Sequence, residues 1–174
     1  CDVFATGTHG AVLAGVSAGD TVAVVGDGAV GISAAYASLR LGAKRVILFG
    51  ERESRLAVAA GFGVETVRIG RDESAAERLR AMNDGVLADR VVECVGMQAA
   101  FDSALSMVRP GGSLGVVGVP HGVGDIAPMR LFGETKHFAG GVAPARHYLP
   151  EFLAATAAGT LDVSPLIDRV YALA

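Results

Sequence analysis

This sequence is short of cysteine, of basic residues and of long apolar runs, and each shortage argues against a class of protein. Cys1 and Cys94 lie far apart and lack the spacing of metal ligands, which favours free thiols in a reducing cytoplasm over a disulfide framework. The net charge of −3, without a basic run, argues against a nucleic acid partner. No apolar stretch approaches the roughly 20 residues of a membrane span, so we expect no membrane partner.

The most informative stretch that is present is a glycine loop between an apolar run and a helix-like segment. Residues 22–25 are apolar, Gly26-x-Gly28-x-x-Gly31 follows at once, and residues 32–39 have apolar side chains at helical spacing. This order predicts a strand, a tight turn and a helix. Gly26 can take the turn dihedrals, Gly28 lets a pyrophosphate approach the backbone, and Gly31 lets the helix pack closely on the strand. The loop therefore predicts a dinucleotide-binding site at a helix N-terminus.

Apolar runs alternate with helical patterns along the rest of the chain, as in a parallel sheet built from right-handed crossovers. The expected strands span residues 21–25, 45–49, 65–69, 90–95, 113–117 and 137–141. The expected helices lie near residues 29–41, 54–60, 75–82, 99–108 and 145–158, and a further one follows Thr6. The fold class is therefore α/β: a doubly wound, mostly parallel six-stranded Rossmann sheet with helices on both faces.

Further motifs follow one another in a fixed order: Thr6-Gly7-Thr8-His9-Gly10, Gly19-Asp20-Thr21-Val22, Glu93-Cys94-Val95-Gly96, Arg109-Pro110-Gly111-Gly112 and Gly118-Val119-Pro120. Together with the glycine loop, this set resembles the coenzyme-binding domain of the medium-chain, zinc-dependent alcohol dehydrogenases over essentially the whole chain. The resemblance implies an NAD(P)-linked alcohol or polyol dehydrogenase that transfers hydride between a substrate carbinol carbon and the nicotinamide. It also implies a small alcohol, aldehyde or ketone as substrate and a cytoplasmic location.

Members of that family carry a second, GroES-like catalytic domain, which is absent here. We therefore expect residues 1–174 to be a single NAD(P)-binding domain, excised from a larger enzyme and inactive alone. The resemblance implies that Asp2 is a catalytic zinc ligand in the parent protein, since it lies four residues before the Thr6-Gly7 pair. A carboxylate suits zinc, and an open zinc site would polarise an alcohol oxygen. Zinc is expected in the parent enzyme and not in this chain.

The resemblance also implies that Thr6 and Val30 lie behind the nicotinamide ring, although a threonine cap and a core valine are the plainer readings. The predicted coenzyme contacts also include Ala29 in the loop and residues at the ends of two strands: Cys94, Val95, Gly96, Val117, Gly118 and Val119. The thiol of Cys94 is more typical of a small core residue than of a nucleophile.

The choice of coenzyme depends on the residue at the end of the second strand, where an acidic side chain would bind the ribose 2′-hydroxyl. Gly50 stands there, followed by Glu51 and Arg52, with Arg55 one turn later. A glycine leaves room for a 2′-phosphate, and Arg52 could bind it, which favours NADP over NAD slightly. Glu51 departs from this pattern, because its charge would repel a phosphate or instead hold a ribose.

The last expected strand predicts a homodimer. The resemblance implies that the segment from Phe138 to Val142 pairs with its copy across a two-fold axis, and exposed edges favour such pairing. Two other function classes stay open. One is the zinc-free quinone reductase branch of the same superfamily, and the other is a non-catalytic NAD(H)-sensing module. The metal content of the full-length protein would separate the first from a zinc enzyme.

Overall fold

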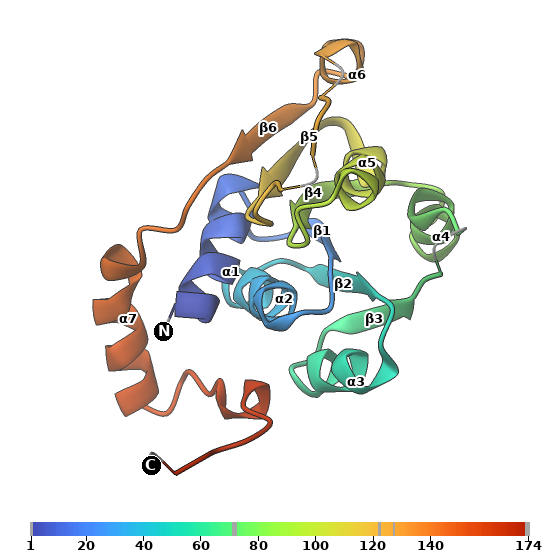
Figure 1. Ribbon diagram of the computed structural model, residues 1–174. Helices are drawn as coiled ribbons and strands as arrows, with labels where there is room; N and C mark the ends of the chain where they lie inside the picture. The colour runs from blue at the N-terminus through green and yellow to red at the C-terminus, as the bar shows by residue number, and fades with distance from the viewer. Residues whose placement is uncertain (1, 71–72, 122, 127, 173–174) are drawn as a thin grey trace.

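The computed structural model describes residues 2–70, 73–121, 123–126 and 128–172. Its centre is a parallel sheet of six strands in the order β3-β2-β1-β4-β5-β6. The strands are β1 (Thr21–Val25), β2 (Arg45–Gly50), β3 (Glu65–Arg68), β4 (Ala88–Glu93), β5 (Val108–Val116) and β6 (His137–Gly140). The strand order reverses between β1 and β4, and in open parallel sheets ligands bind at the carboxyl ends of the strands beside such a reversal. The expected Rossmann fold is confirmed (Figure 1).

Helices cover both faces of this sheet (Figure 1). They are α1 (Asp2–Leu13), α2 (Ala29–Arg40), α3 (Glu53–Gly61), α4 (Ala75–Met82), α5 (Gln98–Met107), α6 (Pro128–Phe132) and α7 (Ala145–Ala157), with a short 3-10 turn at Ser164–Leu166. Successive side chains of β1 point to opposite faces: Val22 and Val24 join the core under α1, α2 and α3, whereas Ala23 and Val25 join the core under α4 and α5. Two buried faces explain why the strands read as continuous apolar runs.

Several boundaries differ from those expected, and three of the differences have a cause that the structure shows. The first helix begins at Asp2, so Thr6 lies inside it and donates from its hydroxyl to the carbonyl of Asp2 (3.0 Å) instead of capping the helix. Strand β4 ends at Glu93, because Val95 and Gly96 turn away to bond the Glu93 side chain. Strand β5 begins at Val108 and runs through the Arg-Pro-Gly-Gly segment, with a register shift opposite Ala88 and Arg90.

Candidate functional site

Three strands end side by side at the reversal point, and their last residues are joined by backbone hydrogen bonds. The N–H of Cys94 donates to the carbonyl of Val25 (3.0 Å). The N–H groups of Val117 and Gly118 both donate to the carbonyl of Glu93 (3.0 and 3.1 Å). The ends of β1, β4 and β5 therefore form one rigid edge, on which the glycine loop and two further loops stand.

The glycine loop forms the tight turn and the close helix–strand contact that its three glycines predict. Gly26 has a φ of +111°, a conformation that side chains rarely adopt. A Cβ on Gly31 would lie 1.8 Å from the carbonyl oxygen of Gly26, so only glycine lets α2 start this close to β1. Gly28 is the N-cap of α2, makes no side-chain cap and has no atom within 4 Å of where a Cβ would be. The first N–H groups of α2, at Ala29 and Val30, therefore lie beside a space that no atom of the described residues fills. An anion could bind there.

The loops after β4 and β5 are packed against each other by two further glycines. A Cβ on Gly96 would lie 2.0 Å from the carbonyl oxygen of Val119, and one on Gly118 would lie 2.3 Å from the N–H nitrogen of Gly96. Val117 is buried beneath them, whereas Val95 and Val119 are exposed. The structure therefore brings the predicted residues of both strand ends together beside the glycine loop.

The side chain of Glu93, for which the sequence motif predicted no role, lies beneath this edge and fixes the loop after β4. Its side chain is fully buried, and Oε1 accepts from the N–H groups of Val95 (2.7 Å) and Gly96 (2.9 Å). Among the described residues, its Oε2 atom is the single buried side-chain oxygen or nitrogen without a hydrogen-bond partner. Burial raises the pKa of this carboxyl group above its usual value. An acidic residue inside the apolar run of residues 90–95 was the available signal.

Cys94 lies next to the glycine loop, with its Cβ 3.7 Å from where a Cβ of Gly31 would be. The side chain packs against the core under α2, and burial together with the neighbouring Glu93 raises the pKa of the thiol. A raised pKa keeps the thiol protonated, which agrees with a packing residue and not with a nucleophile.

The end of β2 is occupied by the side chain of Asp27, for which the sequence motif predicted no role. Asp27, inside the glycine loop, reaches across Gly50 and accepts at Oδ2 from the N–H groups of Glu51 (2.9 Å) and Arg52 (2.7 Å). Its Oδ1 atom lies 3.6 Å from a guanidinium nitrogen of Arg55. The side chains of Glu51, Arg52 and Arg55 are exposed. An acidic residue between two loop glycines was the signal for this contact.

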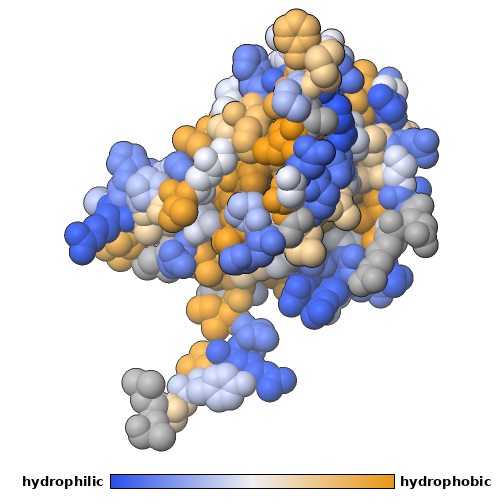
Figure 2. Space-filling model, turned by 45° about the horizontal axis from the view of Figure 1, so that its top comes forward, coloured by the Kyte–Doolittle hydropathy of each residue, from blue (hydrophilic) through white to orange (hydrophobic). Residues whose placement is uncertain are grey.

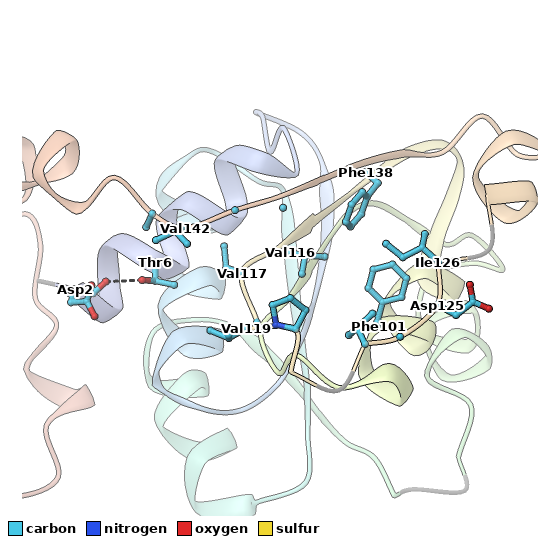
Figure 3. A pocket seen from close by; sticks show the side chains of 17 residues that line it. Asp2, Thr6, Phe101, Val116, Val117, Val119, Asp125, Ile126, Phe138 and Val142 are labelled. Atoms are coloured by element: carbon cyan, nitrogen blue, oxygen red, sulfur yellow. Dashed lines mark hydrogen bonds between the residues drawn. The ribbon is translucent and has the colours of Figure 1, made fainter.

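A mostly apolar cavity of about 690 Å³ opens at the ends of β5 and β6. Its lining includes Asp2 and Thr6 from α1, Val117 and Val119 after β5, and Phe138 from β6 (Figure 3). Figure 2 shows apolar side chains gathered on the face turned toward the viewer, with hydrophilic residues around them. The cavity therefore joins Asp2, the predicted zinc ligand, to four of the predicted coenzyme contacts, whereas the other predicted nicotinamide contacts, Val30, Val95 and Gly96, are not part of its lining.

The described residues contain no group of three or more histidine, cysteine, aspartate or glutamate side chains that could hold a metal ion. His9, near Asp2 in sequence, donates to or accepts from the hydroxyl of Tyr148 at 2.9 Å, and its ring packs edge-on against that tyrosine. Asp2 is thus the single metal candidate of the sequence analysis, and further ligands would have to come from outside the described residues. In the part of the chain that the structure describes, no helix has the length and apolarity needed to cross a membrane.

Comparison with known proteins identifies the family. The model of the zinc-binding dehydrogenase family matches residues 29–158. The NADP-dependent isopropanol dehydrogenase of Entamoeba histolytica is 34% identical over 174 aligned positions, which cover 97% of this chain and 47% of that protein. A putative D-xylulose reductase of Agrobacterium fabrum is 32% identical, with 95% of this chain and 47% of that protein covered. The chain belongs to the zinc-binding dehydrogenase family.

A solved structure agrees with this assignment. Alcohol dehydrogenase TADH from Thermus sp. ATN1 superposes with a TM-score of 0.82 at 32% sequence identity, over 95% of this chain and 47% of that one. The chain thus spans about half the length of these relatives. The resemblance stated from the motifs is confirmed.

Proposed function

We propose that the chain is the coenzyme-binding domain of a zinc-dependent, NAD(P)-linked alcohol or polyol dehydrogenase, and that residues 1–174 are one domain of a larger enzyme. The observation that carries this proposal is the open N-terminus of α2 at Gly28, close to the apolar cavity at the ends of β5 and β6. The first feature suits a pyrophosphate, and the second suits a nicotinamide ring and a small apolar substrate.

The predicted residues of the glycine loop and of the two strand ends then have roles in holding the coenzyme. Gly26, Gly28 and Gly31 shape the loop, and the N–H groups of the first turn of α2 bind the pyrophosphate. The nicotinamide is held in the cavity by Thr6, Val117, Gly118 and Val119. Gly96 packs against Val119 and Val95 against Gly26, so both support this wall, while Val30 and Cys94 pack against the core beneath it. Glu93 positions this wall, because it fixes the N–H groups of Val95 and Gly96. The bound coenzyme would accept or supply the hydride; the apolar lining would keep water from it.

Asp2 is proposed as one zinc ligand of the larger enzyme. It lines the cavity with Thr6 and is exposed, so its carboxylate can bind a zinc ion whose other ligands come from another domain. The described residues do not by themselves complete a zinc site. We therefore expect no zinc-dependent step from this chain alone.

Two observations about the choice of coenzyme point in opposite directions. Arg52 and Arg55 at the start of α3, and the name of the Entamoeba relative, support NADP. The space over Gly50 that a 2′-phosphate would use is filled by Asp27, which supports NAD. We therefore propose NAD(P) as the coenzyme class.

We propose that the substrates of the larger enzyme are alcohols, aldehydes or ketones, that it acts in the cytoplasm and that it has no nucleic acid partner.

We propose that the chain forms a homodimer through the free edge of β6. Strand β6 is bonded to β5 on one side, Phe138 is partly exposed and Val142 is almost fully exposed. Light scattering at tens of micromolar, as a rough working range for weak association, should show a dimer. Replacing Val142 by aspartate should shift it toward monomer, and a monomer in the unaltered chain would refute this pairing.

The experiment that tests the proposed function compares this chain with a longer protein that joins it to a zinc-bearing catalytic domain. The chain alone should bind NADH or NADPH at one site and oxidise no alcohol. The longer protein should oxidise a secondary alcohol or polyol, and a chelator should abolish that activity. Alcohol oxidation by the chain alone, or full activity of the longer protein without zinc, would contradict the proposal.

A further inference from the structure

Asp27 connects the glycine loop to the end of β2 through three contacts. Its Oδ2 atom accepts from the N–H groups of Glu51 (2.9 Å) and Arg52 (2.7 Å). Its Oδ1 atom lies 3.6 Å from a guanidinium nitrogen of Arg55, and the Asp27 side chain is 13% exposed. The carboxylate is therefore held in place from two sides, while a small part of it still faces solvent.

Gly50 gives Asp27 its room. A Cβ on Gly50 would lie 2.4 Å from the Cβ of Asp27 and 2.8 Å from its Oδ2 atom. Contacts that short do not occur between such atoms, so any larger residue at position 50 would displace Asp27. From the sequence alone, Gly50 is explained equally well as a residue that leaves room for a 2′-phosphate. The structure shows the space filled by a carboxylate that comes from a different part of the chain.

The groups bound by Asp27 are those that a 2′-phosphate would need. In a Rossmann domain the adenosine ribose lies at the end of β2, beside the first turn of the glycine loop. A phosphate there binds through backbone N–H groups at a helix start and through arginine. Here the N–H groups of Glu51 and Arg52 already donate to Asp27, and Arg55 pairs with it. A phosphate would also meet the charge of a fixed carboxylate, whereas a ribose 2′-hydroxyl can donate a hydrogen bond to it.

We propose that Asp27 is the specificity-determining residue of the coenzyme site and favours NAD(H) over NADP(H). This inference rests on the proposed function, because it assumes that the coenzyme binds at the glycine loop. The carboxylate that accepts the ribose hydroxyl comes from the glycine loop and not from the end of β2. Glu51, the acidic residue predicted for that role, has an exposed side chain and contributes its backbone N–H to Asp27.

The test measures the dissociation constants of NADH and NADPH by calorimetry for the unaltered chain, Asp27→Asn and Glu51→Gln. Asparagine keeps the volume and one acceptor oxygen for the two N–H groups, but removes the charge. The unaltered chain should bind NADH more tightly, and Asp27→Asn should shift the ratio toward NADPH by about tenfold or more, the factor that corresponds to losing one charged contact. Glu51→Gln removes the other carboxylate of this loop and should shift the ratio less than Asp27→Asn does; an equal or larger shift would overturn the inference.

A second measurement on the unaltered chain does not depend on the folding of a variant. Adenosine 5′-diphosphate and its 2′-phosphorylated form differ only in the group that Asp27 should repel, so the form without the 2′-phosphate should bind more tightly. Tighter binding of the 2′-phosphorylated form overturns the inference, as does a folded Asp27→Asn variant with an unchanged ratio. In both cases the proposed function survives. Binding of neither coenzyme would contradict the proposed function and this inference together.

Discussion

Among the described glycines, Gly31 is the position at which an added methyl group would come closest to another atom. In Gly31→Ala the new Cβ would lie 1.8 Å from the carbonyl oxygen of Gly26 and 2.8 Å from its carbonyl carbon. Ordinary contacts between non-bonded carbon atoms lie at about 3.5 to 4.0 Å, so the backbone of α2 must move away from β1. Forcing atoms into a packed interior costs about 1–3 kcal/mol and sometimes more. The greater helix propensity of alanine offsets this by up to about 1 kcal/mol.

We expect the free energy of unfolding of Gly31→Ala to fall by about 2 kcal/mol, which for a domain of this size lowers the Tm by roughly 4–8 °C. The matched control is Gly28→Ala, whose Cβ meets no atom within 4 Å. Its N-cap position should cost at most about 1 kcal/mol, while the methyl group faces the pyrophosphate and should weaken coenzyme binding. Thermal unfolding followed by circular dichroism, with a coenzyme titration of each variant, separates the two effects. A Gly31→Ala variant as stable as the unaltered chain would refute the close-packing argument.

Three further predictions concern other parts of the molecule. In Gly7→Ala the Cβ would lie 2.5 Å from the backbone nitrogen of Ala34, so the variant should push α1 from α2 and lower the Tm by several degrees; an unchanged Tm would contradict this packing. Burial raises the pKa of Glu93, so the stability that its proton contributes is complete below its unfolded pKa of about 4.3 and is lost as the pH rises through the raised folded pKa. As the pH rises above about 4, the Tm of Glu93→Gln should therefore increase relative to that of the unaltered chain, and a difference in Tm that stays constant with pH would contradict this titration. Tyr148→Phe removes the 2.9 Å hydrogen bond to His9 and should cost about 1 kcal/mol in urea unfolding, whereas no loss would mean that this bond does not help to hold α7.

The architecture was predictable because its signals are local. The glycine loop, the continuous apolar runs and the short intervals between them predict a parallel sheet, and all six expected strands are present. Helix α6 (Pro128–Phe132) was missed because it has five residues, none of them fully buried, which is too short a segment for a helical periodicity. The first helix was placed too late, because Thr6 reads as a helix start although it bonds to the carbonyl of Asp2 one turn earlier.

The candidate site was predictable at its glycine loop and not where side chains cross between loops. Gly26, Gly28 and Gly31 have the conformations and spaces that the motif implies. The contact between Asp27 and the end of β2 joins residues 24 and 25 positions apart, so an acidic residue between two loop glycines signals a polar contact without indicating its partners. Likewise, an acidic residue inside the apolar run of residues 90–95 marks Glu93 as unusual, but does not indicate that its carboxylate accepts from the N–H groups of Val95 and Gly96.

The central claim, that this chain binds a nicotinamide dinucleotide at the ends of its parallel strands, is tested most directly by nuclear magnetic resonance of the isotope-labelled chain. Amide signals would be followed during a titration with NADH. The account predicts saturable shifts for the first turn of α2 and for the loops after β2, β4 and β5, and their loss in Gly28→Ala. Shifts confined to the opposite ends of the strands, or none with either NADH or NADPH, would contradict it.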